Sequence, residues 1–289
     1  MNRIMLASRY SDLMNDLYAQ SAKTAVLESD AALAREGANA NEIVVPSLSM
    51  DGLADYSRND GYVKGSVTLT WSTVRFNYER GRMFEVDSMD DEETQNIAFG
   101  RLAGEFLRTQ AVPELDAFRF AQIASTNGIS KVQGTFTDGE EVIAALRTAV
   151  SALDEAEVPD EDRILFISPE VMGMIEDMDT TKSRSVLSSF AAIVNVPAGR
   201  FFTAVTLYDG TSSGEEDGGF AKAANGKDIN FLIVHKPAVL MFTKHLLSKI
   251  IPPENNPDSD AWRYAYRSYG LCSVFRNKTA GIYLHHRAT

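Results

Sequence analysis

The tail of the chain, residues 249–285, is aromatic, basic and rich in β-branched residues, a composition that favours strands. Tyr, Phe, Val and Ile recur on both sides of a turn signal at Asn277 and Lys278. The sequence therefore predicts two strands around a turn. No charged cluster of the kind that forms an active site occurs in this segment.

The rest of the composition is that of an ordinary globular chain with an acidic excess. Its 289 residues suffice for one large domain or two ordinary ones, and 44% hydrophobic with 24% charged residues argues against disorder. The formal net charge of -12 repels nucleic acid on average, because phosphate neutralisation dominates affinity for it. Such a charge is compatible with a container that holds DNA without adhering to it, and equally with simple solubility.

Cysteine usage and the first residues indicate the compartment. The single cysteine, Cys272, excludes an internal disulfide, and its apolar strand context predicts a buried thiol. Residues 1–18 lack the apolar run of a signal peptide, and no segment reaches the roughly 18 apolar residues that cross a bilayer. We expect no membrane contact and a protein kept in a cytoplasm, or in something assembled there.

The first residues predict a short amphipathic helix followed by an arm. Within residues 8–20, Tyr10, Leu13 and Leu17 recur at helical spacings. Residues 29–41 are rich in Ala, Glu and Asn, which indicates an extended arm. A helix without an apolar partner nearby in sequence is expected to pack on something distant, such as another subunit.

Alternating segments predict a long β-hairpin. Residues 67–76 alternate as a strand with two different faces does, and a second strand-like segment spans residues 81–86. An Asp-Gly turn signal at residues 60–61 precedes them. Residues 43–86 have too few apolar residues for a core of their own, and an isolated hairpin is marginal in water. We therefore expect the hairpin to lie on a neighbour.

A long helix is predicted over residues 90–127. It starts with acidic residues, which suit the positive end of the helix dipole, and Leu102 and Phe106 belong to an apolar stripe at a spacing of four. A continuous helix of this length would span about 50 Å. Pro113 within it predicts a kink.

The middle of the chain predicts a small α/β core. Asp138 and Glu141 form a capping box at a helix start, and Ser168, followed by proline, caps another helix after a short apolar strand. Residues 211–219 form a polar, Gly-rich loop.

The order of these elements resembles that of HK97-like major capsid proteins of tailed bacteriophages and prophages. The strings that carry the similarity to a branch common in Gram-positive hosts are Ser49 to Tyr56, Arg80-Gly81-Arg82, Pro113 to Phe120, and the tail. The similarity covers nearly the whole chain, and the order of the strings makes it specific.

This resemblance implies an α+β fold of the HK97-like type, with an N-arm, an extended β-hairpin loop, a long spine helix, and peripheral and axial domains. The implied units are an N-terminal arm at 1–42, the extended loop at 43–89, the peripheral domain with the spine helix at 90–137, the axial domain at 138–245, and a return at 246–289 that completes the peripheral sheet.

The resemblance also implies which residues contact neighbouring subunits. These candidates are Tyr10, Leu13, Leu17, Tyr56, Arg58, Lys64, Arg80, Arg82, Trp262 and Arg267. Candidates for a loop at the capsomer centre are Glu215, Glu216 and Asp217. Lys64 and Asn277 occupy the regions through which some members cross-link subunits. The alternative is a solvated lysine and a turn asparagine, and no catalytic glutamate can be assigned.

The implied function is that of a major capsid protein. Copies would assemble as pentamers and hexamers into an icosahedral shell around phage double-stranded DNA, which they contact non-specifically. The implied location is the virion, assembled in the host bacterial cytoplasm. Implied partners are other copies, a portal, a decoration protein and a separate scaffolding protein, since no acidic coiled-coil prefix precedes the arm.

Two other interpretations stay open. An encapsulin-type nanocompartment shares the fold but encloses a cargo enzyme, and the content of the particle distinguishes the two. An unrecognised enzyme would need a pocket with perturbed ionisable groups. The four histidines lack metal-ligand spacing, and neither a phosphate loop nor a nucleophile motif occurs. We expect no catalysis, no cofactor and no metal.

Overall fold

The computed structural model describes residues 22–29, 35–36, 41–59, 61–93, 97–178 and 181–288. The predicted N-terminal helix, with the contact candidates Tyr10, Leu13 and Leu17, lies outside the described residues.

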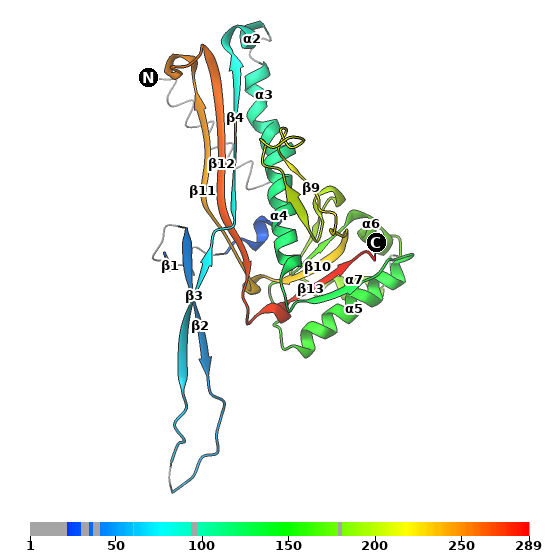
Figure 1. Ribbon diagram of the computed structural model, residues 1–289. Helices are drawn as coiled ribbons and strands as arrows, with labels where there is room; N and C mark the ends of the chain where they lie inside the picture. Colours follow the sequence, from blue (N-terminus) through cyan, green and yellow to red (C-terminus); the bar gives the residue numbers. More distant parts are fainter. Residues whose placement is uncertain are drawn as a thin grey trace.

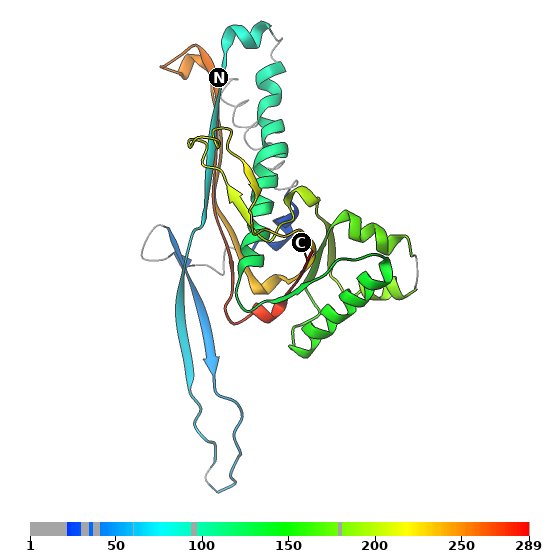
Figure 2. The ribbon, with the colours of Figure 1, turned by 45° about the vertical axis from the view of Figure 1, so that its right-hand side comes forward.

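The molecule is elongated and has three visibly different parts (Figure 1). A β-hairpin projects from one end of the body. A three-stranded sheet with a long helix beside it extends toward the other end, and a five-stranded sheet with its helices forms the broad part. Figure 2 gives the same arrangement from a second direction, with the hairpin clear of the broad part in both views.

The hairpin consists of β2 (Glu42–Met50) and β3 (Val67–Arg75), which pair antiparallel in continuous register. A short strand, β1 (Arg35–Glu36), adds to the outer edge of β2. Residues 51–66 connect the two long strands at the tip. The strand predicted over residues 67–76 is confirmed, and its hairpin partner is β2.

The second strand-like segment predicted for the hairpin, residues 81–86, belongs to another sheet. β4 (Tyr78–Asp87) pairs antiparallel with β12 (Ala261–Val274), and β12 pairs with β11 (Val239–Ile251). The prediction of a single hairpin over residues 43–86 is therefore wrong for β4. Alternation in a strand indicates two different faces but gives no information about a partner far along the chain.

The long helix is built from several segments. They are α2 (Ser88–Glu93), α3 (Ile97–Phe106), the π-helical turn η3 (Leu107–Ala111) and α4 (Val112–Ser125). In η3 the N–H of Val112 donates to the carbonyl of Leu107, and the backbone stays in the α region on both sides. Pro113 stands in the first turn of α4, where its missing N–H is tolerated. A π-helical turn precedes Pro113, and the kink at this point stays a prediction.

The five-stranded sheet combines strands from distant parts of the chain. Their order is β5 (Ser130–Gln133), β13 (Ile282–His286), β10 (Ile229–His235), β6 (Arg163–Ile167) and β7 (Ala192–Asn195). The prediction of two strands in the tail is confirmed, but the two separate. β12 joins the long sheet, whereas β13 pairs with β10 and β5 and so does not complete the sheet of β12.

Alternating residues of β10 face two different cores. Phe231 and Ile233 pack with three helices, α5 (Gly139–Glu155), α6 (Pro169–Glu176) and α7 (Thr181–Leu187). Leu232 and Val234 belong to the larger core, which includes the buried residues of α4. The central strands β13, β10 and β6 are therefore buried on both faces, which explains their nearly continuous apolar sequences.

The predicted caps of this part are confirmed. The Asp138 carboxylate accepts from the Glu141 N–H at 3.0 Å, and the Glu141 carboxylate accepts from the Thr137 N–H at 2.8 Å. Ser168 Oγ accepts from the Val171 N–H at 3.4 Å at the start of α6. These bonds satisfy backbone donors that the first helical turn leaves unpaired.

The remaining short elements are η1 (Lys23–Leu27), η4 (Ala198–Arg200), β8 (Val205–Leu207), β9 (Phe220–Lys222), η5 (Lys236–Ala238), η6 (Pro253–Asn255) and η7 (Thr279–Gly281). β8 and β9 form a small antiparallel sheet. Among the described helices, none has the length and apolar character that crossing a membrane requires.

Candidate inter-subunit surfaces

The hairpin has one apolar face that the described chain leaves uncovered. Its register places Leu48 opposite Leu69 and Met50 opposite Val67, so these side chains share one face. Between 52% and 68% of each is exposed. The neighbouring pair on the other face is Ser49 with Thr68, which is polar. Exposed apolar patches on folded chains mark sites of contact with another molecule.

The tip of the hairpin continues this exposed surface. Leu53 and Tyr62 are almost fully exposed. Three contact candidates, Tyr56, Arg58 and Lys64, are also exposed there. The rings of Tyr56 and Tyr62 pack with centroids 4.8 Å apart, so the tip has local order of its own. Nine of the fourteen exposed large hydrophobic residues in the described chain lie in the hairpin and its tip, which makes this the leading candidate surface.

The base of the hairpin is anchored to the body. Ile43 and Val45 are buried in a small core with Leu240 and Leu271. This core fixes where the hairpin leaves the body and leaves the rest of the strands projecting.

The contact candidate Arg80 is engaged within its own chain. Its Nε donates to Oε1 of Glu114 at 2.6 Å, and Nη2 donates to Oε2 at 3.2 Å. Burial by itself would lower the pKa of Arg80, but the hydrogen bond and the charge of Glu114 raise it overall. The pair joins β4 to α4, so Arg80 holds the helix on the sheet.

The acidic loop at residues 215–217 lies beside the long sheet. Nη2 of Arg82, another contact candidate, donates to the carbonyl of Glu216 at 3.2 Å. Within the loop, hydrogen bonds led by the hydroxyl of Ser212 hold the pKa of Asp209 well below its usual range. The placement of this loop at a capsomer centre stays a prediction.

The contact candidates of β12 differ in exposure. Trp262 is half-buried, and Arg267 is exposed and forms an ion pair with Glu79 of β4. An exposed pair of this kind contributes little stability. The contact of Arg267 with a neighbouring subunit stays a prediction.

Lys64 and Asn277 are both exposed but lie on different parts of the molecule. Lys64 is in the tip of the hairpin, and Asn277 is in the turn between β12 and β13 at the body (Figure 1). A bond between these residues would have to join two copies, and it stays a prediction.

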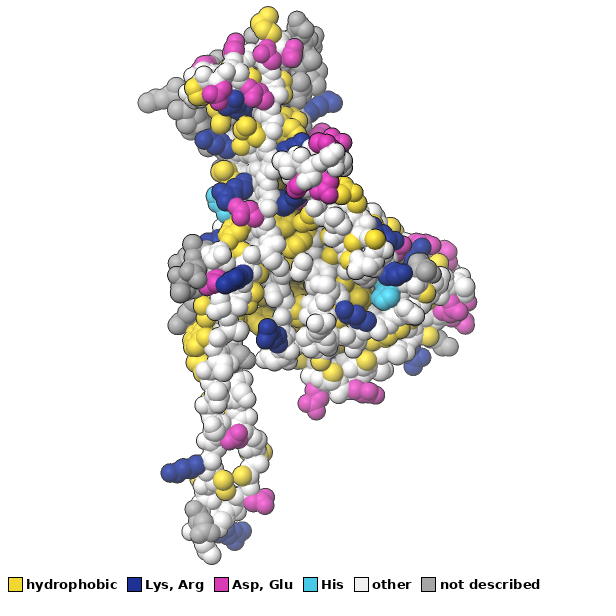
Figure 3. All heavy atoms as spheres, viewed as in Figure 1, with side chains coloured by type: hydrophobic (Ala, Val, Ile, Leu, Met, Phe, Trp, Pro, Cys, Tyr) yellow, Lys and Arg dark blue, Asp and Glu magenta, His cyan; other side chains and the backbone are white. Residues whose placement is uncertain are grey.

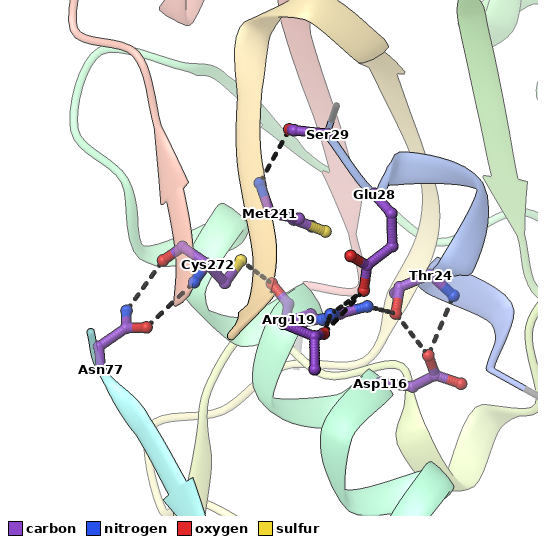
Figure 4. A network of polar contacts seen from close by, with 9 residues as sticks. Thr24, Glu28, Ser29, Asn77, Asp116, Arg119, Met241 and Cys272 are labelled. Carbon is purple, nitrogen blue, oxygen red and sulfur yellow. Dashed lines mark hydrogen bonds and ion pairs between the residues drawn. The ribbon is translucent and has the colours of Figure 1, made fainter. Parts of the chain in front are cut away.

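The sequence analysis missed a buried polar network that fixes residues 22–29 on α4 (Figure 4). The Asp116 carboxylate is fully buried and accepts from the N–H and the hydroxyl of Thr24, at 3.0 and 2.7 Å. It also accepts from Arg200 of η4 at 3.0 Å. Three protein segments therefore meet at one carboxylate.

Arg119 completes this network one turn along the helix. It is 3% exposed and donates to Glu28 at 2.6 Å, to Thr24 at 3.1 Å and to Thr243 of β11 at 3.3 Å. The signal in the sequence was an acid and a base three positions apart within an apolar stretch of helix. The network sets the point at which the N-terminal arm reaches the body.

The remaining candidates for chemistry in the described residues are the thiol of Cys272 and groups of metal-binding side chains. Cys272 is buried, as predicted, and burial raises the pKa of its thiol to about 12. No group of three or more His, Cys, Asp or Glu residues in the described ranges is placed to hold a metal ion.

With this geometry, the chain is similar to solved capsid and particle structures. A structure from Gordonia phage Cozz gives a TM-score of 0.62 over 93% of this chain and 87% of that chain, at 13% identity. The bacteriophage PhiM1 mature capsid gives 0.59 over 86% and 83%, also at 13% identity. A virus-like particle from Pyrococcus furiosus gives 0.57 over 97% and 99%, at 11% identity.

The chain thus has a mixed α+β fold that matches HK97-like capsid proteins. No protein-family description matches the sequence, and neither does any curated protein.

Proposed function

We propose that the chain is the repeating subunit of an icosahedral shell, the major capsid protein of a tailed phage or prophage that occurs in Gram-positive hosts. The observation that carries the proposal is the uncovered apolar face of the hairpin. Covering a large apolar side chain is worth about 1.5–3 kcal/mol. A second copy supplies that cover if the subunits assemble as the fold suggests.

In this proposal the shell is held by many interfaces between copies, arranged as pentamers and hexamers. The hairpin acts as the extended loop. The hairpin and the arm at 1–42 both bind neighbouring subunits. The long sheet with its helix acts as the peripheral domain and the α/β part as the axial domain. Arg80 and Arg82 form contacts within the subunit. The residues that contact neighbouring subunits are Tyr56, Arg58, Lys64, Trp262 and Arg267.

The other partners follow from the same proposal. The shell encloses double-stranded DNA, which an acidic subunit contacts non-specifically and weakly. A portal, a scaffolding protein and a decoration protein complete the particle, and the location is the virion. The role is structural, without catalysis.

Electron microscopy of the negatively stained protein, with mass from light scattering, tests the proposal. Closed particles, or rings of five and six copies, are the expected result. A stable monomer at high concentration, both alone and with a co-expressed scaffolding protein, would contradict it.

An encapsulin-type shell is the second candidate. The Pyrococcus furiosus particle favours it, because that chain and this one match over nearly their full lengths. The content of purified particles decides between the candidates. Packaged DNA supports a phage head, and a co-purifying protein cargo without DNA supports a nanocompartment.

Deletion of residues 1–21 tests the role of the arm. We expect a folded protein with unchanged circular dichroism that no longer forms closed particles, because residues 22–29 remain to anchor the body. Particles that are the same as those of the full chain would show that the arm is not needed to join subunits.

A further inference from the structure

An open groove of about 1340 Å³ lies between the hairpin and the body. The hairpin contributes Leu48 and Val74 to one wall, and the body contributes Leu240 and Phe275 to the other. The lining of the groove is therefore partly apolar.

The rim of this groove carries cations without carboxylate partners. Lys236, Arg276 and Lys278 line it, and none of them forms an ion pair within the described chain. Lys278 is held in place, since its Nζ donates to a backbone carbonyl at 3.2 Å and lies over the ring of Phe275. The lining also contains Arg75, which pairs with Glu42, and two acids, Asp162 and Glu28, of which Glu28 pairs with Arg119. The groove is thus a basic site on a chain of net charge -12.

The far end of the long sheet has the opposite character. Here α2 and the turn around η6 lie together, joined by hydrogen bonds from Ser88 to Asp260. The exposed acids of this end are Asp87, Asp90, Glu254, Asp258 and Asp260, of which Asp258 pairs with Arg263 at 2.9 Å. Met89, which is 62% exposed, projects an apolar side chain among them. In Figure 3, Asp and Glu side chains gather at this end, and Lys and Arg side chains lie beside the base of the hairpin.

We propose that the acidic end of one copy, α2 with the η6 turn, docks in the basic groove of a second copy. The acidic surface lies at the far end of the long sheet, whereas the groove lies at the base of the hairpin, so the two surfaces are well apart within one chain (Figure 1). Charge complementarity sets how the two surfaces align, and the side chain of Met89 packs against the apolar residues of the groove. The contact is head-to-tail, so repetition closes a ring when the rotation between copies allows it.

The docking element is a short helix. Six residues of helix are about 9 Å long, and α2 has six residues. This inference rests on the proposed shell function, for which it names one contact between neighbouring subunits.

Reciprocal charge reversal tests the docking. One variant carries Lys236→Glu, Arg276→Glu and Lys278→Glu, a second carries Asp90→Lys, Glu254→Lys and Asp258→Lys, and a third combines both sets. Light scattering at low salt measures the assembled fraction. We expect each single set to weaken association about tenfold or more, and the combined set to restore it, because opposite charges again face each other.

The matched control reverses two exposed cations elsewhere, Lys131→Glu and Arg147→Glu, and should assemble normally. Unchanged assembly of the single sets, or a combined set no better than either one, would overturn the docking. These outcomes leave the shell proposal standing, since wild-type particles still form.

A second readout covers the case in which the wild-type chain does not assemble. Copies with Arg276→Cys are mixed with copies that carry Asp90→Cys at high concentration under mild oxidation, and Cys272 is buried and does not compete. A disulfide-linked heterodimer, absent with Arg147→Cys in place of Arg276→Cys, supports the docking. If no heterodimer forms, the docking proposal is wrong, whether or not the subunits form a shell.

Discussion

At the scale of single residues, His285 shows how burial sets a charge state. It is 4% exposed and stacks on Phe136 and Phe231, with centroids 4.6 and 5.0 Å away. Its Nδ1 accepts from the amide of Asn230 at 3.0 Å, which leaves the neutral ring protonated on Nε2. Burial, with a smaller effect of the charge on His286, lowers the pKa of His285 to about 4.

This lowered pKa predicts acid sensitivity. The unfolded chain takes up the proton near pH 6.5 and the folded chain only near pH 4, so the free energy of unfolding falls as the pH drops between these values. Urea unfolding at pH 7 and pH 4.5 should show that His285→Phe loses about 2 kcal/mol less than the wild type. His245→Gln, at an exposed histidine, is the control and should follow the wild type. Equal acid losses for His285→Phe and the wild type would contradict the assignment.

The buried network predicts a large cost for losing Asp116. Asp116→Ala leaves Arg200 and Thr24 without their buried acceptor, and removing one partner of a buried ion pair costs about 3–5 kcal/mol. Asp228→Asn breaks the more exposed Lys222 pair, 2.9 Å long, and should cost less than about 1 kcal/mol. Thermal or urea unfolding measures both. Similar losses in the two variants would mean that the network carries little stability.

At the scale of elements, the two faces of the hairpin predict separate effects on folding and assembly. Leu48→Ser with Leu69→Ser removes half-exposed apolar side chains, so the stability of the subunit should change by less than about 0.5 kcal/mol per site. Assembly should be lost, because the face that needs cover becomes polar. Ser49→Ala with Thr68→Ala, on the opposite face, is the matched control. Loss of assembly in both variants would show that the faces are not distinct.

Features that depend on residues close in sequence can be predicted from the sequence, whereas pairings between distant segments cannot. The caps at Asp138 and Ser168 and the strand predicted at residues 67–76 depend on neighbours in sequence, and they are confirmed. The pairing of β4 with β12 and the separation of β13 from β12 depend on contacts across most of the chain. The hairpin tip candidates are exposed, as a contact surface requires, but Arg80 is not, because its acidic partner comes from α4.

At the scale of the whole molecule, the projecting hairpin predicts protection from protease on assembly. Arg58 and Lys64 are exposed in the tip, far from the body, and trypsin should cleave the free subunit there first. In assembled particles a neighbour covers the tip, so cleavage at both sites should slow by more than an order of magnitude. Particles dissociated and digested under the same conditions are the control. Equal cleavage of particles and free subunits would place the tip in solvent, and the hairpin would then need another role.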